Sequence, residues 1–146
     1  MGELIETTTR GLGHVMSEKG VGLRCEPRMA LPLVHGDRQR LRQVLVNLVD
    51  NAADASRPGT EVLVRATTSE TGIAIEIEDR GRGIAEADLG RIFEPFFTTR
   101  PDGTGLGLAI VHKVVRAHGG ELKVRSALGE GSTFTILLPT SAALAV

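Results

Sequence analysis

The sequence predicts an α+β fold: a two-layer sandwich whose mixed, mostly antiparallel sheet of about five strands is covered on one face by about three helices. Two observations support it. Apolar residues repeat with a helical period over residues 38–55 and alternate strictly over residues 73–79. Short turns containing glycine join residues 61–68 to 73–79, and residues 121–127 to 133–138, which is typical of hairpins.

The N-terminal third predicts a helix from Glu3 to about Glu18, then a short strand from Val21 to about Pro27. Residues 33–34 are a candidate for a second short strand. Asp37 is a good N-cap for a helix that continues through residue 55. The residues predicted to face the core are Leu4, Ile5, Leu12, Val15 and Met16 in the first helix and Leu41, Val44, Leu45, Leu48, Val49, Ala52 and Ala55 in the second.

The rest of the chain predicts strands at 61–68 and 73–79 and then a short helix from Glu86 to about Phe93. A further helix runs from residue 105 to about residue 118, where Gly119 and Gly120 end it. The terminal hairpin follows and ends at Pro139. Residues 141–146 are expected to form a frayed tail, so one domain spans residues 1–140.

Composition excludes several classes of protein. With 146 residues and 41% hydrophobic content, the chain is long enough for one domain with a genuine core. A net charge of −1 argues against nucleic acid or an anionic membrane as the main partner. The single cysteine, Cys25, cannot form an internal disulfide and fits a reducing compartment. Without a long apolar stretch or a signal-peptide pattern, the domain is expected in the cytoplasm, without direct membrane contact, even where its parent protein is membrane-anchored.

The helix at 38–55 carries an unusual polar stripe. At about 100° per residue its members fall within roughly 100° of one another; they are Gln43, Asn47, Asp50, Asn51 and Asp54. A solvated face would normally carry lysine, arginine and glutamate, whereas this one carries amides and short acids. Their oxygens are the ligands that Mg²⁺ prefers. An ordinary amphipathic helix with a polar outer face is the alternative interpretation.

Asp79 follows a strand in which Ile73, Ile75 and Ile77 share one face, and it continues that face. A carboxylate there is costly unless something hydrogen-bonds to it. Gly81 and Gly83 let the chain turn sharply and lie close to a flat ligand. We interpret this motif as a carboxylate that accepts from an exocyclic amine in an apolar slot. A simple Asp-Gly turn is the alternative.

A second glycine motif, GTGLGL at residues 103–108, runs into a helix and predicts a phosphate cradle. It lacks the Gly-Lys-Ser/Thr of a P-loop and the preceding strand of a dinucleotide fingerprint, and alone it is weak. Between the two motifs, FEPFF at residues 93–97 predicts an aromatic plug in the core. Its position also indicates a hinge beside a movable segment, residues 98–102.

The order of four motifs now resembles one family. QVLVNLVDNAADA, DRGRGI, FEPFF and GTGLGL are similar to the N box, first glycine box, F box and second glycine box of sensor histidine kinases, within the wider group of gyrase and heat-shock ATPases. The resemblance covers about residues 1–140. The junction FFTTRPDGTGLGL is most similar to the short-lid kinases of the nitrogen-regulation type.

The resemblance implies ATP and Mg²⁺ as ligands. Asp79 would accept from the adenine amino group, Asn47 would hold Mg²⁺, and Arg100 would contact the γ-phosphate, so that Asn47 and Arg100 are the catalytic candidates. The remaining nucleotide contacts would be Asn51, Gly81, Gly83, Ile84, Thr99, Gly103, Thr104, Gly105, Leu106, Gly107 and Leu108.

Two positions depart from the family. Gln43 stands where gyrase-like ATPases place a general-base glutamate, which argues against rapid ATP hydrolysis. Asp54 stands where many kinases carry a lysine, so we expect no phosphate contact from it.

The phosphoacceptor is missing from the sequence. None of the chain's four histidines lies in a His-Glu/Asp-x-x-x-Pro setting. The resemblance therefore implies a domain, monomeric when isolated, that needs a histidine-bearing dimerisation domain as partner and a response regulator downstream. The alternatives are a serine kinase of the anti-sigma-factor type and a regulatory nucleotide-binding module without phosphotransfer.

Overall fold

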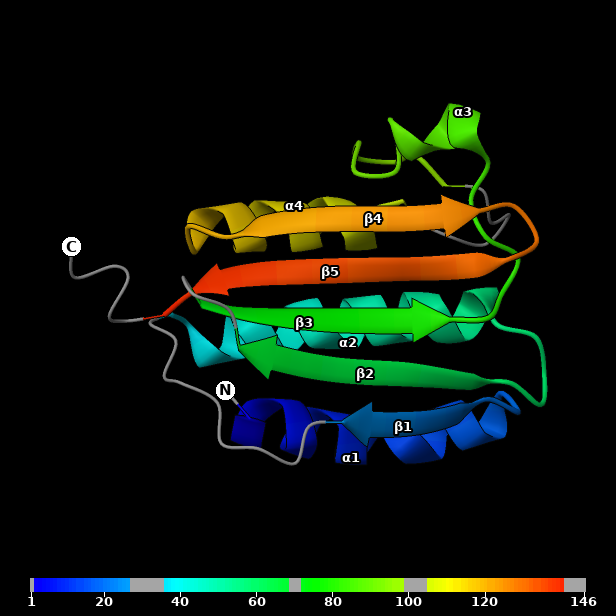
Figure 1. Cartoon of the computed structure of the whole chain (residues 1–146), viewed down its shortest axis with the longest axis horizontal. Helices are drawn as coiled ribbons and strands as arrows, with labels where there is room; N and C mark the ends of the chain where they lie inside the picture. Colours follow the sequence, from blue (N-terminus) through cyan, green and yellow to red (C-terminus); the bar gives the residue numbers. More distant parts are fainter. Residues whose placement is uncertain (1, 27–35, 69–71, 99–104, 141–146) are drawn as a thin grey trace.

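The computed structural model describes residues 2–26, 36–68, 72–98 and 105–140 as a sheet with helices packed on one face (Figure 1). The helices are α1 (Gly2–Glu18), α2 (Arg38–Ala55), α3 (Glu86–Leu89) and α4 (Gly107–Ala117). The strands are β1 (Gly22–Glu26), β2 (Glu61–Thr68), β3 (Gly72–Asp79), β4 (Glu121–Ala127) and β5 (Gly131–Pro139). The strand order is β1-β2-β3-β5-β4, with β1 parallel to β2 and the other pairs antiparallel. The predicted fold class is confirmed.

The core lies between the sheet and the helices α1, α2 and α4. On β3, Ile73, Ile75 and Ile77 are at most 1% exposed, and on α2 Leu48 and Val49 are fully buried. Each such side chain contributes about 1.5–3 kcal/mol when removed from water. The alternation predicted for β3 and the helical period predicted for α2 are both confirmed.

Two predicted core positions are wrong. Val15 is 44% exposed; it lies in the last turn of α1, where only Met16 is buried. Ala55 is only half-buried, and Ala53 is buried in addition to the predicted residues. Ala55 is the last residue of α2, where the chain turns toward Ser56 and leaves the core.

The start of α2 is fixed by a cap and by a neighbouring helix. The Asp37 carboxylate accepts from the backbone N–H groups of Gln39 and Arg40, at 3.0 and 3.2 Å, which confirms the predicted N-cap. The Asp37 N–H donates to His118 Nε2 at 3.0 Å, and His118 Nδ1 lies 2.8 Å from the Val114 carbonyl oxygen. The end of α4 therefore holds the start of α2.

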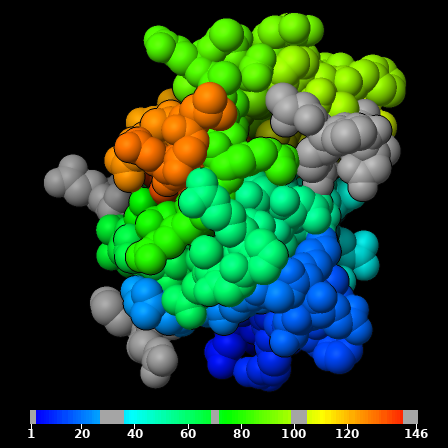
Figure 2. Space-filling model, turned by 90° about the vertical axis from the view of Figure 1, so that its right-hand side faces the viewer, coloured from blue at the N-terminus to red at the C-terminus, as the bar shows by residue number. Residues whose placement is uncertain are grey.

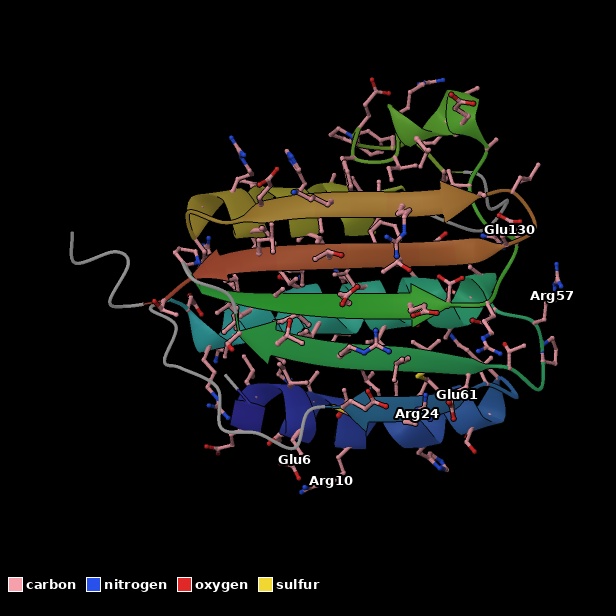
Figure 3. The ribbon with its side chains drawn as sticks, in the orientation of Figure 1. Glu6, Arg10, Arg24, Arg57, Glu61 and Glu130 are labelled. Carbon is pink, nitrogen blue, oxygen red and sulfur yellow. The ribbon has the colours of Figure 1, made fainter. Side chains whose placement is uncertain are left out.

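The ion pairs on the outside of the fold are exposed. Figure 3 shows Glu6 and Arg10 projecting from α1, and Arg24 beside Glu61 on the first two strands. The nearest nitrogen and oxygen atoms are 3.1 Å apart in the first pair and 3.3 Å apart in the second. Such pairs contribute at most about 1 kcal/mol each. Across the described ranges, no helix combines the length and the apolar character needed to cross a membrane.

Two predicted helix boundaries differ from the structure, and two further predictions concern residues that it does not describe. The helix predicted over 86–93 ends at Leu89 and continues as turns, and the helix predicted from residue 105 begins at Gly107. The predicted short strand at 33–34 and the predicted tail at 141–146 lie outside the described residues.

Candidate functional site

A cavity of about 480 Å³ lies where the end of β3, the polar face of α2 and the start of α4 meet. Its size is that of a small-molecule site. Figure 2 looks onto this end of the molecule, where the β4–β5 turn (orange), the residues after β3 (green) and the end of α2 (turquoise) come together. The residues that line it are Asn47, Asp50, Asn51, Ala55, Asp79, Arg82, Gly83, Ile84, Ala85, Asp88, Ile92, Phe97, Thr98, Gly105, Gly107, Leu108, Leu128 and Ser132.

Asp79 is the buried charge of this cavity. It is 3% exposed and continues the inward face of the β3 isoleucines, as predicted. Its Oδ1 accepts from the Gly81 N–H at 2.9 Å, and the Ser132 N–H also donates to it. Burial raises the pKa of the Asp79 carboxyl, while those two N–H donors and the Arg82 charge act in the opposite direction.

The first glycine motif is tied on both sides. The Arg82 N–H donates to the Ala55 carbonyl at the end of α2, at 3.1 Å, and the Arg82 carbonyl accepts from the Gly129 N–H in the β4–β5 turn, at 2.7 Å. A side chain at Gly81 would strike the Ala55 carbonyl, and one at Gly83, whose φ is +72°, would strike the Ala127 carbonyl. Both positions therefore require glycine, and the wall beside Asp79 is fixed backbone.

The polar stripe of α2 is divided by the structure. Asn47, Asp50 and Asn51 line the cavity, whereas Gln43 and Asp54 do not. Gln43 is exposed, and Asp54 is bonded to Lys19 Nζ at 2.9 Å. Part of the stripe therefore lines the cavity and part of it lies on the surface.

The N-terminus of α4 faces the other end of the cavity. Its N-cap residue, Leu106, makes no side-chain capping bond, in contrast to the Asp37 cap of α2. Gly107 and Leu108 line the cavity, and Asn47 Nδ2 donates to the Gly107 carbonyl at 3.4 Å, which joins α2 to the second glycine motif. A helix N-terminus without a side-chain cap favours an anion.

The aromatic motif at residues 93–97 was predicted as a plug in the core, and the structure places only part of it there. Phe93 and Phe97 pack partly buried against the core, and Phe93 stacks on His112 at 5.3 Å, but Phe96 is 74% exposed. Phe96 has φ +69°, and its N–H donates to the Gly105 carbonyl at 2.9 Å. A side chain at Gly105 would strike the Phe96 backbone. This hydrogen bond therefore joins the end of the aromatic motif to Gly105 in the second glycine motif.

Most of the predicted site residues that lie within the described ranges line this cavity. Asn47, Asn51, Asp79, Gly83, Ile84, Gly105, Gly107 and Leu108 line it. Gly81 and Leu106 stand next to lining residues without lining it themselves. Thr99, Arg100, Gly103 and Thr104 lie outside the described residues.

Ser132 is a lining residue that the sequence analysis missed. It is 6% exposed and directly opposite Asp79 in the β3–β5 register. Its Oγ lies 2.8 Å from Ser126 Oγ, which also accepts from the Ile84 N–H at 2.8 Å. Extending the inward alternation of Phe134, Ile136 and Leu138 by one step would have found it.

Comparisons with known proteins show which family the chain resembles. Residues 36–142 match the family described as histidine kinase-, DNA gyrase B-, and HSP90-like ATPase. The sensor histidine kinase ZraS of Escherichia coli K12 is 41% identical over 138 residues, which are 94% of this chain and 30% of ZraS. AtoS, a histidine-protein kinase of the same strain, is 42% identical over 107 residues, 73% of this chain and 18% of AtoS.

Solved structures show the same fold. Full-length ShkA in complex with AMPPNP has a TM-score of 0.84 and 34% identity over 94% of this chain and 29% of its own. The mycobacterial sensor histidine kinase MprB has a TM-score of 0.82 and 35% identity over 95% of this chain and 93% of its own.

The chain belongs to the histidine kinase-, DNA gyrase B- and HSP90-like ATPase family. Within that family its relatives are sensor histidine kinases, and it corresponds to their ATPase domain. It spans less than a third of the length of ZraS and AtoS.

Asp79→Asn tests whether the buried carboxylate lowers the free energy of unfolding of the domain. A raised folded-state pKa means that the ionised carboxylate destabilises the fold. The penalty is absent below the ordinary value of 3.8 and grows as pH rises through the raised pKa. We therefore expect the unliganded variant to unfold at higher urea than the wild type at neutral pH, with the difference vanishing in acid. A variant less stable than the wild type at neutral pH would contradict this account.

Proposed function

We propose that this domain binds ATP with Mg²⁺ in the cavity and supplies the γ-phosphoryl group to a histidine on a separate dimerisation domain. The observation that carries the proposal is one cavity with a buried carboxylate, Asp79, at one end and, at the other, the N-terminus of α4, whose N-cap residue Leu106 makes no side-chain capping bond. An acceptor for an amine and a cradle for anions are what the two ends of ATP require.

At the base end, Asp79 accepts a hydrogen bond from the adenine amino group. Gly83 and Ile84 line the adjacent wall, and Gly81 shapes the turn that leads into it; backbone there replaces side chains and lets a flat ring approach. Ser132 offers its hydroxyl beside Asp79. Guanine presents a carbonyl where adenine has its amine, so this end discriminates between the two.

At the phosphate end, the backbone N–H groups that open α4 meet the phosphate oxygens. Gly105 and Gly107 line this end together with Leu108, and Leu106 lies between the two glycines. The resemblance to sensor histidine kinases adds Thr99, Gly103 and Thr104 to these contacts, and Asn51 on α2 to the sugar and phosphate region.

Asn47 is the proposed Mg²⁺ ligand, and its chemistry fits the ion. It stands in the cavity wall with Nδ2 engaged by the Gly107 carbonyl, so Oδ1 is the amide atom left to face a cation. An amide oxygen is a suitable Mg²⁺ ligand. When bound, the ion would neutralise charge on the phosphates.

In the proposed transfer, an imidazole nitrogen of the partner histidine forms a bond to the γ-phosphorus as the bond to the β–γ bridging oxygen breaks, and ADP leaves. Arg100 stabilises the charge on the transferring group. Gln43 lies outside the cavity wall and an amide is no base, so water is not activated from that position. A response regulator then receives the phosphoryl group.

We place this activity in the cytoplasm, where ATP and reducing conditions coincide, whatever anchors the parent protein. The domain's only cysteine, Cys25, is consistent with such conditions.

Calorimetric titration with ATP and GTP in the presence of Mg²⁺ tests the proposal. ATP should bind, GTP should bind at least tenfold more weakly, and Asp79→Asn should reduce the preference, since a charge-assisted hydrogen bond contributes about 1.5–3 kcal/mol. Adding an acceptor domain from a sensor histidine kinase, with labelled ATP, then tests the transfer. Failure to bind millimolar ATP would refute the proposal; binding without any transfer would leave a regulatory module as the function.

Asn47→Ala is expected to remove most of the Mg²⁺ dependence of ATP affinity while leaving the thermal midpoint of the unliganded domain within about 2 °C. The side chain lies on the cavity side of α2, so its loss opens no void in the core. Titrations with and without Mg²⁺ measure the first quantity and calorimetric melting the second. A large drop in the melting temperature would mark Asn47 as structural instead.

Arg100→Ala is expected to weaken binding of ATP more than binding of ADP, because only ATP carries the γ-phosphate charge. With an acceptor domain present, transfer should fall further than affinity, since the charge matters most in the transition state. Parallel ATP and ADP titrations of both proteins provide the check. Equal losses for the two nucleotides would show that Arg100 is a general surface charge.

A further inference from the structure

One lysine from outside the motifs reaches the polar stripe of α2. Lys19 follows α1, and its Nζ donates to Asp50 Oδ1 at 3.0 Å and to Asp54 Oδ1 at 2.9 Å. These residues are more than 30 positions apart in the chain, so the contact joins two helices. Asp54 stands where many kinases of the resembled family carry a lysine, and here Lys19, in the turn after α1, brings an ammonium group to that position.

The backbone around Lys19 is fixed. The Lys19 N–H donates to the Met16 carbonyl at 2.9 Å, and Gly20 follows with φ +74°. The Gly20 carbonyl accepts from the Gly59 N–H at 2.8 Å, in the turn between α2 and β2. The end of α1 is thus fastened near the end of α2, and the ammonium group is delivered from an anchored position.

This cluster is less exposed than the ordinary ion pairs of the surface. The side chains of Lys19 and Asp54 are 34% and 28% exposed and that of Asp50 is 52% exposed, against 74% and 71% for Arg10 and Glu6. Burial lowers the pKa of Lys19, but the hydrogen bonds and charges of Asp54 and Asp50 together raise it above its ordinary value. The ammonium is therefore charged, shared between two carboxylates.

Asp50 is the member of this cluster that lines the cavity, on the same helix face as Asn47 and Asn51. An uncompensated carboxylate there would repel a polyanionic nucleotide. We propose that Lys19 is a positioning residue of the nucleotide site: it neutralises Asp50 and Asp54 and holds both carboxylates, so that the α2 wall accepts the phosphates. This inference rests on the proposed function and adds to the site a residue from the turn after α1.

Lys19→Met tests the inference through its dependence on ligand charge. We expect Mg·ATP to bind roughly three- to tenfold more weakly, Mg·ADP to lose less, and adenosine to bind as in the wild type, with the ATP loss shrinking at high salt. Lys19→Arg should keep most of the affinity. The triple variant Lys19→Met, Asp50→Asn, Asp54→Asn should recover wild-type affinity, because the charges that Lys19 compensates are then gone.

Arg10→Met is the matched control. It removes one positive charge from α1, where Arg10 pairs with Glu6 on the solvent side as Figure 3 shows. It should leave every affinity unchanged. Melting of each unliganded variant identifies any that unfold.

Three outcomes would overturn the inference: Lys19→Met binds ATP as the wild type does, adenosine loses as much affinity as ATP, or the triple variant shows no recovery. The first means that Asp50 does not act on the nucleotide, and the second that Lys19 only supports the fold. A wild-type domain that does not bind ATP would instead refute the proposed function, and this inference with it.

Discussion

The structure around the cavity depends on keeping one carboxylate, Asp79, out of water. A charge at the end of a row of buried isoleucines is unfavourable, and here hydrogen bonds from the backbone N–H groups of Gly81 and Ser132 offset part of that cost. To supply the first, the chain must turn immediately after β3, close to Ala55, where only glycine fits. To supply the second, β5 must pair with β3 in register up to its first residues. The pairing of β3 with β5, the glycine turn after β3 and the buried carboxylate therefore depend on one another.

Helix α2 connects the core to the cavity. One face buries Leu48 and Val49 against the sheet, and the opposite face carries Asn47, Asp50 and Asn51 into the site. Because the helix is rigid and capped, its position relative to the sheet fixes the polar groups relative to Asp79. The packing that stabilises the domain is therefore also what sets the spacing of the site.

At the end of the cavity near Gly105, one non-glycine residue has a positive φ angle. Phe96 adopts a left-handed conformation that costs a non-glycine residue about 1–2 kcal/mol, and it exposes an aromatic ring. In return its N–H bonds to the Gly105 carbonyl and fastens the F box to the second glycine box. Strain and exposed apolar surface next to a cavity are features that proteins keep for function more than for stability.

The sequence by itself determined most of the elements, the fold class and eight of the eighteen residues that line the cavity. Periodicity is local, so the alternation around Asp79 and the helical stripe at Asn47 were predicted correctly. What it did not determine depends on contacts between distant segments. Ser132 lines the cavity because the register of β5 against β3 places it opposite Asp79. Phe96 lies outside the core, contrary to the prediction, and its backbone is hydrogen-bonded to Gly105. Lys19 meets Asp54 only because α1 packs on α2. Pairing across more than 30 residues is set by packing, and no local pattern encodes it.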